Sequence, residues 1–349
     1  MQSAVDFLQC VFVLFAIDIL KSKVYNIIKS ALPYAYRRMI MKLASSSGDY
    51  LRYVPTIVGA VKEFKDSKFK YINLELGNTF PDDEESFSEM VKTYEAAAEY
   101  AGVKYSTSHA SCVSPANPLT DENYKSCVET VRRSIELSGR LGIDRTVVHA
   151  VESTALSKHD FLEINKRFYH DIMPAAEKYG MRVMTENTDD FDRPLTTGKE
   201  MMELVKYVDH PLLGVCWDTA HANMNERARE VGQYDCLYDI GDKLWGLHIS
   251  DNFGLHSHHH HSWPFNGNIN WDSVLRALVD VKYGGFFTFE ASYTLFHHRN
   301  CSCGRKPWTH EGEEINTVFN PSLELKKKAV DLLYECGKYL LESYGLYEE

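Results

Sequence analysis

The sequence predicts an α/β fold: a single-domain (β/α)8 TIM barrel preceded by a helical N-terminal extension. Short β-rich apolar segments recur along the chain, with midpoints at residues 43, 73, 106, 146, 184, 215, 247 and 287. The segments are 40–46, 70–76, 103–109, 143–149, 181–187, 212–218, 244–250 and 284–290. Helical patterns such as Phe87–Tyr100 and Asn123–Leu141 fill the intervals, and a last helix is expected at about 322–343. This alternation favours a closed barrel over an open doubly wound sheet.

Length and composition agree with one soluble barrel. The chain has 349 residues, and barrels of this type contain about 250 to 400. Apolar residues make up 44% and charged residues 25%, which excludes collagen-like, disordered and disulfide-scaffold proteins. No GxGxxG or P-loop motif follows any apolar segment, so a nucleotide-binding Rossmann fold has no support.

Charge and cysteine content bear on partners and compartment. Lys and Arg number 38 and Asp and Glu 49, which gives a net charge of −11. An acidic surface disfavours broad contact with nucleic acid or an anionic membrane, so neither partner is expected. The 8 cysteines are irregularly spaced and too sparse for a disulfide framework. Reduced thiols, and therefore a cytoplasmic protein, are the expectation.

The N-terminal extension, 1–38, is set apart from the barrel, which is assigned to residues 39–349. Residues 4–20 are strongly apolar but include Asp6 and Asp18, and no Lys or Arg precedes them. A signal peptide needs a basic start, and a spanning helix needs about 20 clean apolar residues. Two interpretations stay open: an amphipathic or buried helix, or translation that begins at Met39 or Met41. We expect no membrane anchor, and we expect the barrel to fold without this segment.

The ends of the last six segments carry the candidate functional residues. They are His109, His149, Glu186, Asp218, His248 and Glu290. In a barrel the carboxyl ends of all strands meet on one face, so these side chains would share one cavity. Each alone has an ordinary explanation, such as a core histidine, a helix cap or half of a salt bridge. Together they predict a metal centre, because imidazole and carboxylate groups suit borderline divalent ions.

Sequence motifs surround these residues. Glu186-Asn187 closes the fifth segment, GVCWDTAH (Gly214–His221) the sixth and LHISDN (Leu247–Asn252) the seventh. HSWPFNGNINW (His261–Trp271) follows, and Glu290 closes the eighth. Through these motifs the chain, over residues 40–345, resembles the xylose isomerase-like TIM barrel superfamily. That superfamily includes sugar-phosphate isomerases and epimerases, ketose 3-epimerases, hydroxypyruvate isomerases, inosose dehydratases and endonuclease IV.

The resemblance implies a catalytic metal site. Glu186, Asp218, His248 and Glu290 would hold a divalent ion, namely Mn²⁺, Co²⁺, Zn²⁺ or Mg²⁺. Glu186 and Glu290 would also be the catalytic pair that moves a proton on opposite faces of the substrate carbon. Substrate contacts are expected from His109, His149, His221, His261, Asn187 and Trp217. Trp217, Trp263, Phe253 and Phe265 are candidate pocket aromatics, with barrel packing as the alternative.

In the endonuclease IV branch a fuller ligand set binds three zinc ions. That set adds His109, His149, His221 and an Asp-x-His pair to the four residues above. Here His259 stands where that Asp is expected, and Phe265 replaces a glycine of the following motif. These departures count against a complete three-zinc site and leave the four-residue site unchanged.

Three functions follow from this pattern. The first is a metal-dependent isomerase or epimerase that acts on a small sugar, sugar phosphate or polyol by proton transfer through an enediolate. A dehydratase, which is a lyase of the same superfamily, uses similar chemistry. The alternative is an endonuclease IV-like phosphodiesterase with a multinuclear zinc site, but the loop after His109 carries no Lys or Arg to grip DNA. The third is a non-catalytic barrel that binds sugar or metal. Barrels of this kind often pair, so a homodimer is a further expectation.

Overall fold

The structure, a computed structural model, describes residues 39–111, 120–151, 156–189, 194–255, 261–295 and 307–347. The expected N-terminal extension, 1–38, lies outside these residues, and so does His259.

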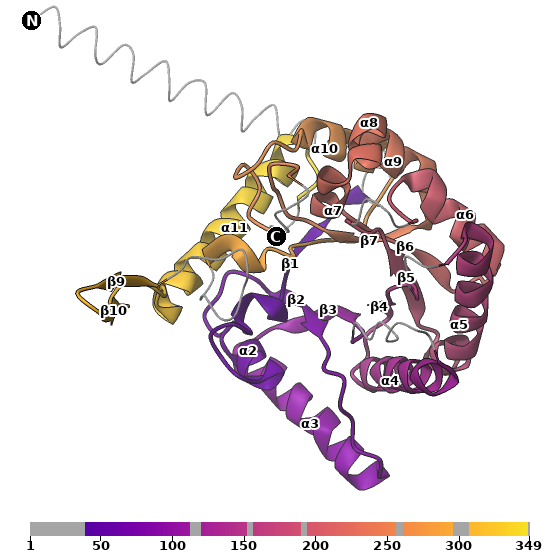
Figure 1. Ribbon diagram of the computed structural model, residues 1–349, viewed down its shortest axis with the longest axis horizontal. Helices are drawn as coiled ribbons and strands as arrows, with labels where there is room; N and C mark the ends of the chain where they lie inside the picture. The colour runs from indigo at the N-terminus through magenta and orange to yellow at the C-terminus, as the bar shows by residue number, and fades with distance from the viewer. Residues whose placement is uncertain are drawn as a thin grey trace, which may run out of the picture.

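Eight parallel strands form the barrel at the centre of the molecule (Figure 1). They are β1 (Lys42–Ser46), β2 (Tyr71–Glu75), β3 (Lys104–His109), β4 (Arg145–Val147), β5 (Arg182–Glu186), β6 (Leu213–Asp218), β7 (Leu244–His248) and β8 (Phe286–Thr288). Hydrogen-bonded neighbours follow the order β7-β6-β5-β4-β3-β2-β1-β8. Just beyond the last strands, Ile249 N donates to Thr288 O at 2.8 Å and brings β7 and β8 together. Each of these eight strands lies within one of the expected segments, so the predicted barrel is confirmed.

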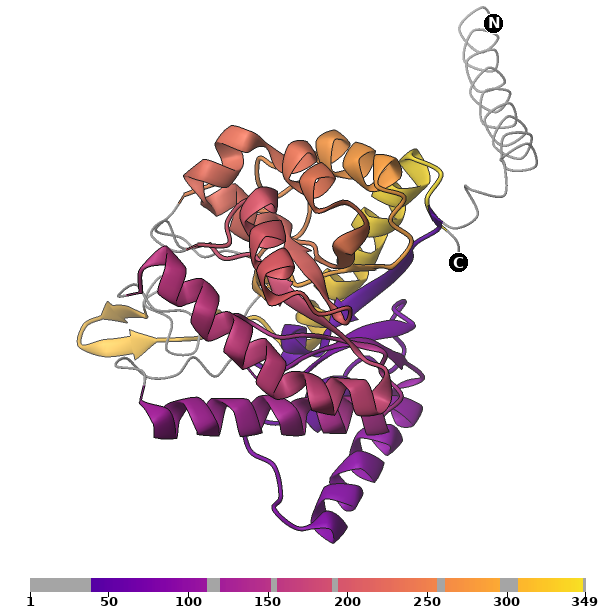
Figure 2. The same cartoon turned by 90° about the vertical axis from the view of Figure 1, so that its right-hand side faces the viewer.

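Helices surround the strands (Figures 1 and 2). They are α2 (Ile57–Lys62), α3 (Glu84–Ala101), α4 (Asp121–Arg140), α5 (Lys158–Tyr179), α6 (Gly198–Val208), α7 (Thr219–Met224), α8 (Glu226–Val231), α9 (Gln233–Ile240), α10 (Trp271–Asp280) and α11 (Leu323–Ser343). Most begin after a Ser, Thr, Asp or Asn whose side chain accepts a first-turn amide. At α6 this is a full capping box between Thr197 and Glu200. The long helices α3, α4 and α11 lie where the sequence predicts them.

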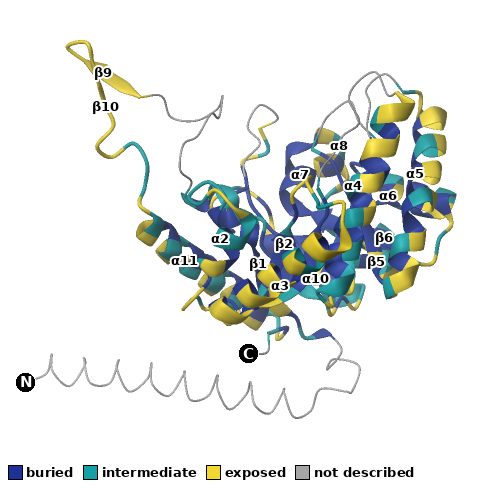
Figure 3. Cartoon of the chain, turned by 90° about the horizontal axis from the view of Figure 1, so that it is seen from below, coloured by how far each residue is buried: buried dark blue, intermediate teal, exposed yellow. Residues whose placement is uncertain are grey.

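The hydrophobic core occupies two places. One part fills the space between strands and helices, where Trp217, Phe287 and Phe289 are fully buried. Figure 3 shows that the buried stretches gather on the strands and on the inner sides of the helices. The other lies inside the barrel, where Val147, Met184 and Cys216 from three neighbouring strands form a small apolar cluster. The interior of the barrel is therefore a packed layer, on which the side chains at the carboxyl ends of the strands rest.

Beyond the eighth strand, β9 (Trp308–His310) and β10 (Glu313–Ile315) form an antiparallel hairpin that projects from the barrel (Figures 1 and 3). This hairpin is not among the elements predicted from the sequence. Among the described residues, none of the helices combines the length and the apolar composition that crossing a bilayer requires.

Candidate metal centre

The carboxyl ends of the strands bring the candidate residues together. His109, Glu186, Asp218 and His248 are the last residues of β3, β5, β6 and β7. His149 and Glu290 follow the ends of β4 and β8 by two residues. Asp218 and His248 are paired directly across β6 and β7, whereas Glu186 pairs with Cys216, two residues before Asp218. The strand ends nevertheless bring these side chains to one face of the barrel.

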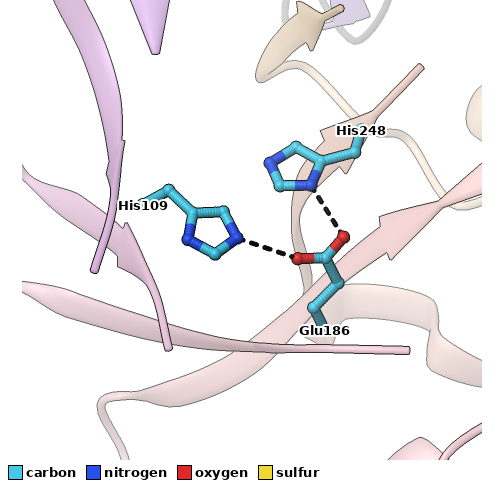
Figure 4. A group of neighbouring side chains, drawn as sticks. All are labelled: His109, Glu186 and His248. Carbon is cyan, nitrogen blue, oxygen red and sulfur yellow. Dashed lines mark hydrogen bonds and ion pairs between the residues drawn. The ribbon is translucent and has the colours of Figure 1, made fainter. Parts of the chain in front are cut away.

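Glu186 is the centre of this group (Figure 4). Its carboxylate is 1% exposed, and its Oε1 lies 2.8 Å from His248 Nδ1. Its Oε2 lies 3.3 Å from His109 Nε2 and 3.2 Å from His149 Nε2. One carboxylate from β5 therefore meets imidazoles from β3, β7 and the end of β4.

Two more carboxylates approach from the neighbouring strands. Glu290 Oε2 lies 2.8 Å from His248 Nδ1, the same nitrogen that contacts Glu186. Asp218 Oδ1 accepts a hydrogen bond from His221 N at 2.6 Å and so caps α7. One ligand atom each from Glu186, Asp218, His248 and Glu290 can be chosen so that all four lie within 4.8 Å of one another. This spacing suits the first shell of a single divalent ion.

Two further groups of potential ligands share the same spacing. His109, Glu186 and His248 form one, and Asp218, His221 and His261 form the other. His221 Nδ1 lies 2.9 Å from the backbone oxygen of Asn187, and His261 Nδ1 lies 3.1 Å from that of Glu290. The imidazoles therefore have fixed orientations, and the arrangement offers ligands for more than one ion.

The electrostatics of the cluster match a cation site. Burial opposes ionisation of Glu186, but the charge of His248 and hydrogen bonds from its histidine neighbours hold its pKa well below the usual value. Glu290 is only partly buried, with 27% of its side chain exposed; desolvation raises its pKa, but His248 again outweighs this and lowers it. Burial lowers the pKa of His109, yet the charges of Glu75 and Glu186 outweigh it and raise this pKa to about 9. For His221 the charges of Asp218 and Glu186 likewise overcome burial and raise the pKa to about 9.

Buried carboxylates need a positive charge beside them, and two kinds of cation can supply it. Protonated histidines do so in the metal-free protein, as the raised histidine pKa values indicate. A divalent ion is the other source. Asp218 favours it, because this residue is fully buried and its Oδ2 makes no hydrogen bond to the described residues. The residues present therefore fit a bound divalent metal ion.

A cavity of about 600 Å³ opens onto this cluster. Its polar wall includes His109, His149, Glu186, His221, His261 and Glu290. Its other wall is mainly apolar and includes Leu51, Ile57, Val131, Val148 and Phe168. A volume of this size accommodates a small organic molecule next to the candidate ligands.

Two residues with an expected substrate contact lie elsewhere. Asn187 is fully buried, and its side chain bridges to the backbone of Asp218, accepting from its N at 2.7 Å and donating to its O at 3.0 Å. It fixes the ends of β5 and β6 relative to each other. Trp217 is fully buried between barrel and helices, and its Nε1 donates to Gln233 Oε1 at 2.8 Å. Neither belongs to the cavity wall.

The other aromatic candidates lie outside the cavity wall as well. Phe253 and Phe265 are 62% and 54% exposed, and Trp263 packs against the core. The cavity also contains a residue that the sequence analysis did not single out. Glu75 ends β2, lines the cavity and pairs in register with His109. It occupies the same strand-final position as the residues that were predicted, and that position is the signal that would have identified it.

Comparison with known proteins identifies the family. Residues 61–311 match the model of the xylose isomerase-like TIM barrel family. The chain belongs to that family. An uncharacterized protein of Methanocaldococcus jannaschii is 31% identical over 170 residues, which cover 48% of this chain and 57% of the relative. Another, from Sinorhizobium fredii, is 26% identical over 180 residues, 49% of this chain and 54% of the relative. The chain thus spans just over half the length of these two relatives.

A ketose 3-epimerase and several solved structures are also similar. The ketose 3-epimerase of Arthrobacter globiformis is 21% identical over 239 residues, 66% of this chain and 76% of that enzyme. A D-tagatose 3-epimerase-like protein superposes with a TM-score of 0.61 at 22% identity and covers 87% of this chain and 100% of its own. A D-psicose 3-epimerase, solved in the presence of D-fructose, superposes with a TM-score of 0.63 at 16% identity. The superposition covers 86% of this chain and 99% of the epimerase chain. At these identities the likeness to the structures establishes the barrel fold.

Proposed function

We propose that this protein is a divalent-metal-dependent isomerase or epimerase of a small sugar or polyol, with Glu186 and Glu290 as its proton-transfer pair. The observation that carries the proposal is the convergence of these two carboxylates. They come from β5 and β8, and each lies 2.8 Å from the same nitrogen, His248 Nδ1. Asp218 completes the group within 4.8 Å.

The chemistry follows from the residues around the cavity. A bound divalent ion would make the proton next to a substrate carbonyl more acidic. Glu186, Asp218, His248 and Glu290 would hold that ion. Glu186 or Glu290 removes the proton and the other carboxyl group returns one, so that the reaction passes through an enediolate. Both pKa values are held low, so both groups are ionised at neutral pH: one can accept the substrate proton directly, and the other takes up a proton from solvent before it returns one to the opposite face.

The remaining cavity residues orient the substrate. His109, His149, His221 and His261 line the cavity beside the carboxylate pair and can bind hydroxyl or carbonyl oxygens. Asn187 acts through the backbone of Asp218 rather than on the substrate. The similarity to a ketose 3-epimerase supports a ketose as the substrate class.

A phosphodiesterase related to endonuclease IV is the second candidate. The two additional ligand groups favour it, because they offer places for more than one ion. A specific feature counts against it: no Lys or Arg stands among the described residues that line the cavity. Enzymes that cut a nucleic acid backbone hold its phosphates largely with such side chains.

Metal analysis combined with two activity assays separates the candidates. The full-length protein is analysed for metal per chain and then tested on D-tagatose, D-allulose and D-fructose, and on a DNA duplex with one abasic site. We expect epimerisation of a ketose and no incision. Incision of the duplex by a protein that holds several zinc ions would establish the second candidate instead. A metal-loaded protein that binds a sugar and turns over neither class would be a non-catalytic barrel.

We further propose that residues 39–349 form one domain and that the protein works in the cytoplasm. The compartment is supported by three cysteines of the described residues that form no disulfide: Cys216, Cys236 and Cys336.

A further inference from the structure

Glu75 is held in place by a buried hydrogen-bond network that crosses three strands. Its Oε1 accepts from Ser46 Oγ at 2.8 Å and from Asn73 Nδ2 at 2.9 Å. Thr107 Oγ1 in turn donates to Asn73 Oδ1 at 2.8 Å, and Glu75 N donates to Ser47 Oγ at 2.9 Å. These partners are all at most 5% exposed. Burying so many polar groups is costly unless they are satisfied, and here they satisfy one another around a single carboxylate oxygen.

The backbone leaves room for this carboxylate. A Cβ atom on Gly48 would stand 3.3 Å from Glu75 Cγ and 3.1 Å from Ser46 Oγ, which is closer than side chains normally pack. Gly48 N also donates to Ser46 Oγ at 3.0 Å and so orients the hydroxyl that binds Glu75. The short segment after β1 is therefore shaped around the Glu75 side chain.

The two carboxylate oxygens of Glu75 differ in their hydrogen bonding. Oε1 has two donors, whereas Oε2 makes no hydrogen bond to any residue in the described part of the chain. Glu75 lines the cavity on the side of β2, beside His109. It belongs to none of the three potential ligand groups. The network thus fixes one oxygen and leaves the other for a molecule in the cavity.

The charge of the cavity wall restricts that molecule. The described lining residues include the carboxylates Glu75, Glu186, Asp189 and Glu290, and Lys and Arg are absent from them. A phosphate group placed near Glu75 would meet negative charge without a cationic side chain from these residues. A hydroxyl group can instead hydrogen-bond to the second oxygen of Glu75. Burial raises the pKa of this carboxyl group, whereas the charge of His109 and the hydrogen bond from Ser46 favour its ionised form, which is a strong acceptor.

We propose that Glu75 binds a hydroxyl group of the substrate away from the reacting carbon and makes the cavity selective for uncharged polyhydroxy compounds over their phosphate esters. This inference rests on the proposed function for the orientation of the substrate, but it is tested by binding alone. Ser46 and Asn73 are positioning residues for Glu75.

Glu75→Gln is the informative substitution. Because Ser46 and Asn73 both donate to Oε1, the glutamine oxygen takes that place and the amide NH₂ faces the cavity. The change removes the negative charge and replaces an acceptor with a donor in the same volume. We expect the affinity for an uncharged ketose to fall about 10-fold, the effect of weakening one charged hydrogen bond. The affinity for the phosphate ester should stay the same or rise.

The experiment is calorimetric titration of the Mn²⁺-loaded full-length protein with D-fructose, D-tagatose and D-allulose, and with their 6-phosphates. Metal content and thermal stability are measured first for the wild type, Glu75→Gln, and Glu99→Gln as an exposed control on α3. The wild type and the control should bind at least one uncharged ketose about 10-fold or more tightly than its 6-phosphate. Glu75→Gln should lose most of that preference.

Several results would overturn the inference. They are a wild-type preference for a 6-phosphate, no binding of any uncharged ketose, unchanged selectivity in Glu75→Gln, or loss of metal from that variant. If Glu75→Gln does not fold, the same titrations are made with Ser46→Ala. This change removes one of the two hydrogen bonds that hold Glu75 Oε1, so the preference for the uncharged ketose should fall. Selective binding without turnover of any ketose would contradict the proposed function and leave the role of Glu75 intact.

A double-mutant cycle separates positioning from general stability. Ser46→Ala should weaken ketose binding in the wild type by less than Glu75→Ala does. In the Glu75→Ala background it should have no further effect on binding, because its only route to the ligand is gone. Additive losses in the double variant would contradict the positioning role.

Discussion

The two ends of the barrel interior differ sharply although the same strands build both. Along β5, β6 and β7, the residues Glu186, Asp218 and His248 stand at the carboxyl ends. Two residues earlier stand Met184, Cys216 and Gly246. Because side chains alternate along a strand, each earlier residue points to the same side as its successor, about 6.6 Å further down. A distance of two residues along each of these three strands thus separates a charged layer from an apolar one.

The apolar layer is closely packed, whereas the charged layer faces an open cavity. The space beside Met184, Cys216 and His248 is about 10 Å³, against about 600 Å³ on the carboxyl side. Burial raises the pKa of Cys216 to about 12, so its thiol stays neutral beneath the carboxylates. The two layers therefore differ in role. The apolar layer packs the strands together, and the charged layer offers its side chains to a ligand in the cavity.

The largest effect is expected in the charged layer. Glu186→Gln and Glu290→Gln each keep a metal-binding oxygen but remove a proton acceptor. Turnover of an active ketose should fall about 10²–10⁴-fold in kcat, as is usual when a general acid or base is lost. Steady-state kinetics measure the loss, with Glu99→Gln as the control. Near-wild-type kcat in Glu290→Gln would remove it from the proton-transfer pair.

His248→Ala should lower metal content and activity together, because this imidazole contacts both Glu186 and Glu290. Elemental analysis of the purified variant measures the first effect and kinetics the second. His109→Ala refines the test. In a one-metal enzyme it should weaken substrate binding at unchanged metal content, and in a multi-metal enzyme it should remove one ion. Full metal occupancy in His248→Ala would contradict the assigned site.

A substitution in the apolar layer should lower the stability of the fold and leave metal binding unchanged. Met184→Ala removes a fully buried side chain and should lower the free energy of unfolding by about 2–5 kcal/mol. Denaturant unfolding measures this loss. Metal content per folded chain should stay at the wild-type value, since Met184 offers no ligand to the cluster. Loss of metal from a folded Met184→Ala protein would show that the two layers are not separable.

A smaller effect concerns the pH dependence of stability. In the metal-free protein the pKa values of His109 and His221 are raised from 6.5 to about 9. A raised pKa stabilises the fold fully below the unfolded-state value, and this stabilisation is lost as the pH rises through the folded-state value. The free energy of unfolding should therefore fall by roughly 2–5 kcal/mol between pH 6.5 and pH 9.

Metal binding should remove this dependence. Ligation requires deprotonated imidazoles, so the metal-loaded protein should keep or gain stability as the pH rises over the same interval. Urea unfolding with and without a chelator compares the two forms. The same downward slope in both forms would mean that these histidines do not serve the ion.

The barrel could be predicted because each strand carries its own signal. Alternating β-rich segments separated by helical stretches determine the order of elements, and closure of the barrel follows from their number. The candidate ligands could be predicted for the same reason, since the end of a strand fixes where a side chain points. The short helices α7, α8 and α9 and the hairpin β9–β10 could not, because such short elements depend on contacts with the rest of the chain.

Other contacts escaped the sequence analysis for identifiable reasons. Trp217 lies between two inward-pointing residues, Cys216 and Asp218, so strand alternation turns it toward the helices. Asn187 binds a backbone that only the folded barrel brings near. Glu75 has apolar neighbours and no motif, and its network depends on Ser46 and Thr107 from adjacent strands. Such partners are distant in sequence and become visible only in three dimensions.

The most direct test of the central claim is isotopic. The metal-loaded full-length protein is incubated in D₂O with a ketose that it epimerises or isomerises, and deuterium at the reacting carbon is measured by NMR. Proton transfer by Glu186 and Glu290 predicts that deuterium enters the product, because both carboxyl groups exchange with solvent. Turnover that leaves the product free of deuterium would contradict the account, since it would mean that hydrogen moves directly within the substrate.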